Sequence, residues 1–430
     1  MSGQPIVGFC GLTHLGLVSA AATAAQGFPV IGFDPDADRA AAVTAGRLGI
    51  VEPGLDDLVR EHRTRLQFTS DPASLHACAV VFIASDVPTD DTGASDLDGI
   101  SRLIGRVLPA LGDHATLVIL CQVPPGFTRA VALPPDRLYG QVETLVLGSA
   151  VERASRPERF IVGCADPDAP LPEAYRNLLE RFDCPILSVR YESAELAKIA
   201  INCALTATLT VANTLAELSE RVGADWAEIA PALRLDRRIG PHAYLSPGLG
   251  LGGGNLERDL ATVLRLATAT DSEASVIAAF LRNSAHRRDW VWRVLKNELL
   301  ARKADAVVGI LGLAYKANTD SIKNSPALAL VGQLTSSRLR VFDPVVPSAA
   351  LGYPGVTGAA SALEAAQGAD ALVVMTPWPL FRELKAADLA AVMMGRTVVD
   401  PHRVLDGRAI VAAGLDYFTL GAPPVRTSTR

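Results

Sequence analysis

The chain has 430 residues, of which 49% are hydrophobic and 20% are charged, and its formal net charge is −6. This length exceeds what one hydrophobic core holds, and the composition is that of a soluble globular protein. The acidic balance excludes nucleic-acid binding through a general basic field. The six cysteines form neither a CxxC pair nor a cluster with histidines, so we expect no metal site and a reducing compartment. We find no signal peptide and no membrane-spanning run, and we therefore expect a cytoplasmic protein.

Strand-like apolar runs alternate with alanine-rich helical runs along the chain. A helix is expected at 14–27, and strands are expected at 5–11, 28–34, 79–85, 115–122, 144–149 and 159–164. Residues 192–223 hold a helical period without proline or internal glycine, which is typical of a helix that joins domains or forms a subunit interface. Further strands are expected at 305–315, 338–344, 369–378 and 396–405.

Alternation of strands and helices favours parallel, doubly wound sheets. We therefore predict an α/β fold with two Rossmann-like doubly wound domains joined by a central helical dimerisation segment. The predicted domains are residues 1–190, 191–300 and 301–425.

The segment CGLTHLG at 10–16 follows a strand and opens a helix, as a dinucleotide-binding turn does. Glycines occupy its first and third key positions, and Thr13 replaces the middle glycine that lets the backbone approach a pyrophosphate. Asp34 ends the next strand, where a carboxylate can accept both ribose hydroxyls and disfavours the 2′-phosphate of NADP. We predict NAD binding, and a Rossmann half that binds no cofactor is the alternative. The residues expected at NAD are Gly11, Thr13, His14, Leu15, Gly16, Asp34 and Arg39.

Eight motifs in a fixed order make the chain similar to the UDP-glucose/GDP-mannose dehydrogenase family along nearly its whole length. They are GLTHLG with FDPD, EPGLDDL, VPTD, QVPPG, YESAELAKIAIN, RRIGPHAYLSPGLGLGGGNLERD, GLAYKANTDSIKNSPAL and VVDPHRVLDG. The resemblance implies an N-terminal NAD domain, a central dimerising helix and a C-terminal domain that binds a nucleotide diphosphate. It further implies a homodimer and a small-molecule substrate, namely a nucleotide sugar or a nucleoside.

The resemblance also shows what this chain has lost. Family members oxidise an alcohol twice, and a cysteine in GGSCFPKD captures the intermediate aldehyde before a thioester is hydrolysed. Aligned to that motif, GGGNLERD places Asn255 at the cysteine position, and an amide cannot act as the nucleophile. Gln122 replaces a threonine linked to the catalytic water, and Leu147 replaces one of two glutamates. Three losses on one half-reaction indicate that the thioester half is not performed.

The groups for hydride removal are present. Lys198 and Asn202 match a family pair four residues apart, so they share one helix face and can stabilise an oxyanion. Asp259 matches the family acid that holds this network, and Glu143 is the glutamate that remains. The residues expected to be catalytic are Lys198, Asn202, Asp259, Glu143 and Asn255, the last through polar contact with the substrate.

Further residues are assigned by their alignment with family motifs. Arg238 matches an arginine that reaches the active site of the neighbouring subunit, and either Arg403 or His402 holds the position of a C-terminal substrate arginine. The remaining expected cofactor contacts are Val87, Thr89, Gln122, Arg258 and Lys323. The expected substrate contacts are Leu145, Arg238, Tyr244, Leu245, Gly250, Gly252, Lys316 and Arg403.

With no thiol to trap an aldehyde, we expect transient oxidation followed by elimination or epimerisation and return of the hydride. This expectation describes a redox-neutral dehydratase or epimerase with NAD as catalyst. Three alternatives stay open at this point. They are a two-electron dehydrogenase that releases a carbonyl product and NADH, a conventional acid-forming dehydrogenase with a displaced nucleophile, and a non-catalytic family member.

Overall fold

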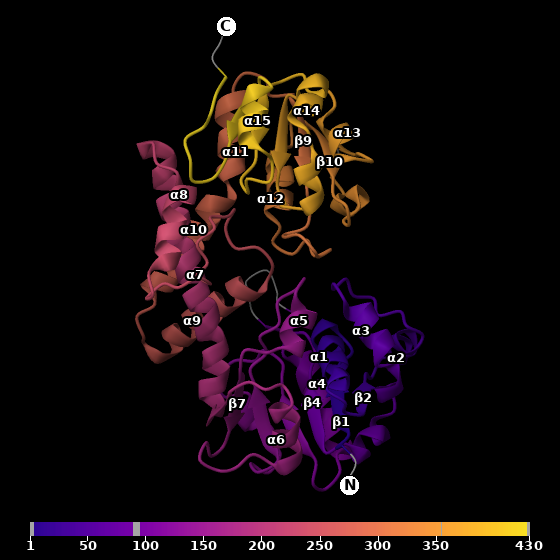
Figure 1. Ribbon diagram of the computed structural model, residues 1–430. Helices are drawn as coiled ribbons and strands as arrows, with labels where there is room; N and C mark the ends of the chain where they lie inside the picture. Colours follow the sequence, from indigo (N-terminus) through magenta and orange to yellow (C-terminus); the bar gives the residue numbers. More distant parts are fainter. Residues whose placement is uncertain (1–3, 89–94, 354, 428–430) are drawn as a thin grey trace. The chain divides into compact units, whose positions relative to one another are not determined.

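An eight-stranded sheet with the order β3-β2-β1-β4-β5-β6-β7-β8 forms the core of the N-terminal part of the chain (Figure 1). The computed structural model describes residues 4–88, 95–353 and 355–427. The chain divides into two units, Met1–Ile201 and Asn202–Arg430. This division into two units does not test the predicted division into three domains, which stays a prediction.

The strands of the first unit are β1 (Val7–Cys10), β2 (Val30–Phe33), β3 (Leu66–Thr69), β4 (Val80–Ile83), β5 (Thr116–Ile119), β6 (Leu138–Gln141), β7 (Phe160–Cys164) and β8 (Ile186–Arg190). Its helices are α1 (His14–Ala25), α2 (Ala37–Thr44), α3 (Leu55–Glu61), α4 (Asp98–Val107), α5 (Ala150–Ser155) and α6 (Glu173–Glu180). The order of the first six strands is that of a doubly wound dinucleotide-binding sheet, which confirms the predicted fold class.

One predicted strand is wrong, and the last two strands, β7 and β8, run against the first six. Residues 144–149 form a loop, because side chains rather than a neighbouring strand bind their backbone: Arg153 Nε donates to the Thr144 carbonyl at 2.8 Å, and Glu52 accepts from Gly148 N at 2.9 Å. The strand lies earlier, at β6, and β7 pairs with β6 in the antiparallel sense. The sheet is therefore parallel only as far as β6.

The second unit contains a six-stranded parallel sheet with the order β11-β10-β9-β12-β13-β14. Its strands are β9 (Val307–Leu311), β10 (Arg338–Phe342), β11 (Val356–Gly358), β12 (Ala371–Val374), β13 (Thr397–Val399) and β14 (Asp416–Phe418). Its helices are α8 (Trp226–Leu235), α9 (Asn255–Thr270), α10 (Ser275–Arg288), α11 (Trp290–Leu295), α12 (Pro326–Gln333), α13 (Ala362–Ala366), α14 (Ala386–Val392) and α15 (Gly407–Ala412).

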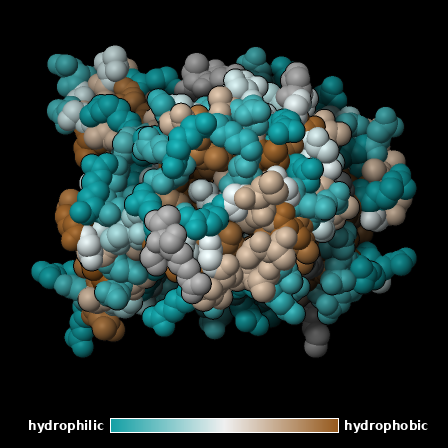
Figure 2. All heavy atoms as spheres, turned by 90° about the horizontal axis from the view of Figure 1, so that it is seen from above, coloured by the Kyte–Doolittle hydropathy of each residue, from teal (hydrophilic) through white to brown (hydrophobic). Residues whose placement is uncertain are grey.

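The long helix α7 (Tyr191–Val222) begins in the first unit and continues into the second, close to the predicted bounds. It is long and apolar enough to cross a membrane by length and composition, which corrects our expectation that no such run exists. A single helix of this kind is weak evidence for a membrane, because core helices of soluble proteins pass the same test. In the view of Figure 2, hydrophilic residues cover much of the surface, with hydrophobic ones scattered among them.

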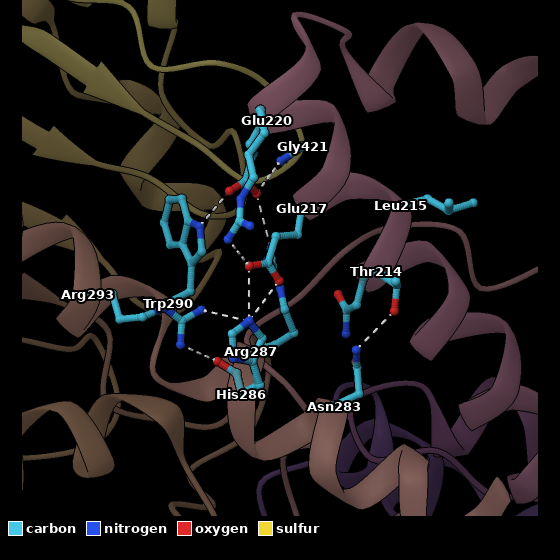
Figure 3. Close-up of polar contacts among 12 residues, drawn as sticks. Thr214, Leu215, Glu217, Glu220, Asn283, His286, Arg287, Trp290, Arg293 and Gly421 are labelled. Atoms are coloured by element: carbon cyan, nitrogen blue, oxygen red, sulfur yellow. Dashed lines mark hydrogen bonds and ion pairs between the residues drawn. The ribbon is translucent and has the colours of Figure 1, made fainter.

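A buried charge network joins α7 to α10, α11 and the chain after β14 (Figure 3). The fully buried guanidinium of Arg287 donates to Glu217 at 3.0 Å and to Glu220 at 3.2 Å. Glu220 also accepts from Trp290 Nε1 at 2.9 Å and from Gly421 N at 3.0 Å. Burial opposes ionisation of Glu217, but hydrogen bonding from His286 and the charge of Arg287 outweigh it and lower the pKa of this carboxyl. The network fastens the central helix to the C-terminal sheet within the second unit.

We predict that Glu220→Gln lowers the free energy of unfolding by about 2 kcal/mol or more, because it leaves a buried guanidinium with one carboxylate fewer. The measurement follows unfolding of the second unit by heat and by chemical denaturant. The matched control is Glu180→Gln, which breaks an exposed pair with Arg176 at 3.8 Å. The control should change stability by about 0.5 kcal/mol or less, and equal effects of the two substitutions would contradict the network's role.

Candidate active site

The turn between β1 and α1 brings backbone N–H groups and glycines together as a dinucleotide requires. Gly11 has a φ of +103°, and a Cβ on it would lie 2.9 Å from the Ser85 Cβ. A Cβ on Gly16 would lie 1.8 Å from the Gly11 carbonyl oxygen, so only glycine lets α1 start this close to the sheet. Thr13 precedes α1 in an extended conformation, and its Oγ1 accepts from Asp86 N at 3.0 Å. The start of α1 therefore presents free N–H groups in the arrangement that binds a pyrophosphate.

Asp34 follows β2 and is almost completely buried. Its carboxylate accepts from Leu12 N at 2.8 Å, from Asp36 N at 3.0 Å and from Arg39 Nη1 at 3.2 Å. A carboxylate has about four acceptor positions, so one is left for a ribose hydroxyl. The residues present in this turn fit NAD.

The other expected cofactor residues of the first unit have different surroundings. His14 Nε2 contacts a Glu52 oxygen at 2.8 Å, Leu15 is buried in the core, and Val87 packs against the apolar cluster that includes Ile83. Thr89 lies outside the described residues. Leu145, an expected substrate residue, is partly buried against the cluster that contains Leu15.

The structure brings together Lys198, Glu143 and Gln122, which the sequence analysis assigned separately. Lys198 Nζ lies 3.3 Å from Glu143 Oε2, and both side chains are mostly buried. The other Glu143 oxygen accepts from Leu145 N. Together with Gln122, the ion pair lines a cavity of about 20 Å³, which is large enough for one water molecule. An ammonium and a carboxylate in contact can pass a proton to or from a bound alcohol.

A displaced nucleophile is not found in this cavity. Cys121 also lines it, but its Sγ donates to the Ile83 carbonyl at 3.2 Å, and burial raises the pKa of the thiol to about 12. Cys203 is half-buried on α7, and burial together with the nearby Asp259 raises the pKa of its thiol as well. A thiol with a raised pKa is a poor nucleophile, because only the thiolate attacks carbon.

In the second unit, Asn202 and Asp259 form a buried polar pair. Asn202 Nδ2 donates to Asp259 Oδ2 at 2.5 Å, and Arg258 Nε donates to Asp259 Oδ1 at 3.3 Å. All three side chains are buried. Asp259 thus orients the Asn202 amide, while Arg258, expected at the cofactor, contacts Asp259.

Asn255 is exposed and is the first residue of α9. The glycine-rich loop before it is closely packed, since a Cβ on Gly250 would lie 2.4 Å from the Ser284 carbonyl oxygen. A Cβ on Gly252 would lie 3.1 Å from the ring of Tyr315. The loop is also tied to the segment before α12 by a hydrogen bond from Gly253 N to the Lys323 carbonyl at 3.0 Å.

The remaining expected substrate residues differ in exposure. Tyr244 is exposed, whereas Leu245 is buried beside Trp226. Arg238 is 88% exposed and pairs with Asp236 at 2.6 Å, an arrangement that leaves the arginine at the surface of the chain.

Two expected substrate cations lie beside the second sheet. Lys316 Nζ lies 5.5 Å from the centre of the Tyr315 ring. Arg403 makes two hydrogen bonds to Asp225, at 2.6 and 3.1 Å, and His402 Nε2 contacts the Met375 carbonyl at 3.2 Å.

Glu195, which was not among the predicted site residues, lies one helical turn before Lys198. Its buried carboxylate accepts from Gly126 N at 2.6 Å and from Thr128 N at 2.8 Å, and burial raises its pKa. It fastens the loop after Gln122 to α7. Its position inside the motif YESAELAKIAIN was visible in the sequence, but nothing there indicated its partner.

Comparisons with known proteins agree along the whole chain. Models of the UDP-glucose/GDP-mannose dehydrogenase family match as an NAD binding domain over 6–183, a central domain over 192–284 and a UDP binding domain over 309–407. UDP-glucose 6-dehydrogenases of Bacillus subtilis and Haloferax volcanii are 28% and 31% identical, covering 97% and 95% of this chain and 93% and 98% of their own. The structure of a UDP-glucose dehydrogenase from Pyrobaculum islandicum aligns with a TM-score of 0.85 at 27% identity, over 98% of both chains.

These comparisons overturn the expectation of a redox-neutral dehydratase or epimerase. The relatives are named as dehydrogenases, whose reaction is net oxidation. The physical reason for the error is that loss of a thiol removes a trap for an aldehyde but does not supply a means of elimination or require that the hydride return. The cofactor is NAD and the ligand of the C-terminal domain is a nucleotide sugar, because this chain belongs to the UDP-glucose/GDP-mannose dehydrogenase family.

Proposed function

We propose that this protein is an NAD-dependent dehydrogenase that oxidises a hydroxyl group of a UDP-sugar and releases the carbonyl product and NADH after a single hydride transfer. The contact between Lys198 and Glu143 at 3.3 Å carries this proposal. The similarity to UDP-glucose 6-dehydrogenases over nearly the full length supports net oxidation of a UDP-sugar. The amide at Asn255 and the protonated Cys121 support a reaction that ends after one oxidation.

NAD, when bound, accepts the hydride that leaves the carbinol carbon. Lys198 and Asn202 lie one turn apart on α7 and donate hydrogen bonds to the alcohol oxygen. As the hydride leaves, the hydroxyl proton passes to Lys198 while Lys198 passes a proton to Glu143. Asp259 holds the Asn202 amide in its donor orientation through the bond of 2.5 Å. The products are a carbonyl compound, NADH and one proton, so electrons and atoms balance.

The protein is further proposed to be a cytoplasmic homodimer. Val211, Leu215, Leu218 and Val222 recur along one side of α7 and are each at least 40% exposed. Figure 3 shows Leu215 pointing away from the buried charge network. A continuous apolar stripe of this kind is typical of a helix that packs against another copy. The same stripe accounts for the high hydropathy of α7 without a membrane.

The proposed chemistry predicts a single NADH per molecule of UDP-glucose, or of the UDP-sugar that turns over. The measurement combines absorbance of NADH with mass spectrometry of the product, which should be a carbonyl compound or its hydrate. The matched variant restores the lost groups together through Asn255→Cys, Gln122→Thr and Leu147→Glu. It should raise the yield toward two NADH, because a thiol at the start of α9 has a lowered pKa and can trap the aldehyde. Two NADH and a uronic acid from the unaltered protein would contradict the proposal.

Lys198→Met should lower kcat/KM by about 100-fold or more, because it removes the group that stabilises the alkoxide and relays the proton. NAD binding, measured by calorimetry, should stay within about twofold, since the cofactor turn is untouched. Lys303→Met is the control, because Lys303 also pairs with a carboxylate, that of Asp370, at 2.9 Å. Lys303 is far in the sequence from the residues of the proposed chemistry. Equal activity of the two variants would exclude the assigned role of Lys198.

Leu215→Glu combined with Leu218→Glu should convert the protein to a monomer, because two buried charges would face each other across the helix pair. Light scattering coupled to size-exclusion chromatography should change from about twice 45.2 kDa to 45.2 kDa. Leu380→Glu with Met394→Glu changes two exposed apolar residues elsewhere and should leave the mass unaltered. A mass of 45.2 kDa for the unaltered protein would refute the dimer.

A further inference from the structure

Glu52 lies before α3, and its side chain is completely buried. One carboxylate oxygen accepts from His14 Nε2 at 2.8 Å and from Gly148 N at 2.9 Å, and the other accepts from Ala150 N at 2.8 Å. These donors come from two segments that are 38 residues before and 96 to 98 residues after Glu52 in the sequence. A buried carboxylate needs such donors, and here all of them belong to segments with proposed roles in binding.

The first segment is the cofactor turn. His14 is the first residue of α1, directly after Thr13, so its ring position is tied to the N–H groups that face the pyrophosphate. Since a carboxylate only accepts hydrogen bonds, Nε2 of His14 is the donor in this contact. Any shift of the first turn of α1 therefore changes the hydrogen bond to Glu52.

The second segment is the loop at 143–150, which carries Glu143 and Leu145. Ala150 is the first residue of α5, and the Ser149 side chain makes no capping hydrogen bond there. Glu52 takes this part instead and caps α5 from a distant segment. Apolar packing also connects this loop to α1, because Leu145 packs against the core cluster that includes Leu15 of α1.

We propose that Glu52 is a positioning residue that joins the cofactor turn to the loop at 143–150, so that NAD and the nucleotide sugar bind with positive coupling. This inference rests on the proposed function, which places the reacting hydroxyl of the sugar at Lys198 and Glu143. When the dinucleotide orders the first turn of α1, His14 holds Glu52, and Glu52 holds the loop in its binding conformation. Coupling of this kind is reciprocal, so the sugar nucleotide also strengthens binding of the dinucleotide.

Calorimetry with UDP-glucose, in the absence and presence of saturating NADH, tests the coupling without turnover, because NADH accepts no hydride. The unaltered protein should bind UDP-glucose at least about fivefold more tightly with NADH than without it. In Glu52→Gln this ratio should fall below about twofold. The amide offers one acceptor oxygen, so its NH2 group must face at least one of the three donors.

His14→Phe is the second variant, and it decides the question if Glu52→Gln does not fold. It keeps the ring and the contacts from Glu52 to α5 but removes the donor from the cofactor turn, so the ratio should again fall below about twofold. Asp370→Asn is the control, because Asp370 is also a buried carboxylate that accepts from a backbone group, Val307 N at 2.9 Å, in the other unit. The control should keep the coupling of the unaltered protein.

Each outcome distinguishes this inference from the proposed function. A ratio near one for the unaltered protein, or an unchanged ratio in His14→Phe and in folded Glu52→Gln, overturns the role of Glu52. If the unaltered protein binds neither NADH nor UDP-glucose, the proposed function itself fails. Normal binding of both ligands without coupling leaves the proposed function standing and refutes only the positioning role.

Discussion

The close approach of α1 to the ends of β1 and β4 is the constraint on which the first unit depends. It is possible because Gly11 and Gly16 have no Cβ, and one on Gly16 would lie 1.8 Å from the Gly11 carbonyl oxygen. The approach places the start of α1 beside Asp34, whose carboxylate closes the turn through Leu12 N at 2.8 Å. It also places His14 within reach of Glu52, so the geometry of the cofactor turn extends to the loop that carries Glu143.

The second sheet repeats part of this geometry without the cofactor turn. Both sheets have the same order for their first six strands, and Phe-Asp-Pro spans the end of the second strand of each, at 33–35 and 342–344. Gly312 has a φ of +93°, and Asp343 accepts from Leu313 N at 2.7 Å as Asp34 accepts from Leu12 N. However, the helix after β9 begins only at Pro326, so no helix N-terminus meets this turn. Within the described residues, the turn after β1 therefore meets a helix N-terminus and the turn after β9 does not, which agrees with the match of the first sheet to an NAD binding domain.

The sequence predicted those elements whose formation depends on the pattern of neighbouring residues. The alternation of apolar runs predicted α7 and the central strands of both sheets within a few residues, because burial on both faces leaves a strong pattern. It missed β3, β6, β8, β11 and β14, and the exposed positions of β3, β8 and β11 interrupt that pattern. The run at 144–149 looks like a strand, yet the side chains of Glu52 and Arg153 hold it as a loop, and no signal within the run reports them. Hydrophobic periodicity likewise could not predict that Lys198 pairs with Glu143 and Asn202 with Asp259. These four residues were identified only by their match to family motifs. The predicted reaction type was wrong. An amide at the expected position of the nucleophile indicates which step cannot occur, but it does not indicate which reaction occurs instead.

The polar pairs tie several of the proposed site residues to the stability of the fold, but they do not include Asn255. Loss of Lys198 would leave the mostly buried Glu143 without its cation, and loss of Asn202 would remove the 2.5 Å bond to the buried Asp259. An unpaired buried carboxylate costs several kcal/mol, of the order of a third of the stability of a domain. Asn255 is exposed at the first position of α9, where a change of side chain leaves no buried group unpaired. Stability therefore constrains the groups proposed for oxidation much more strongly than it constrains position 255.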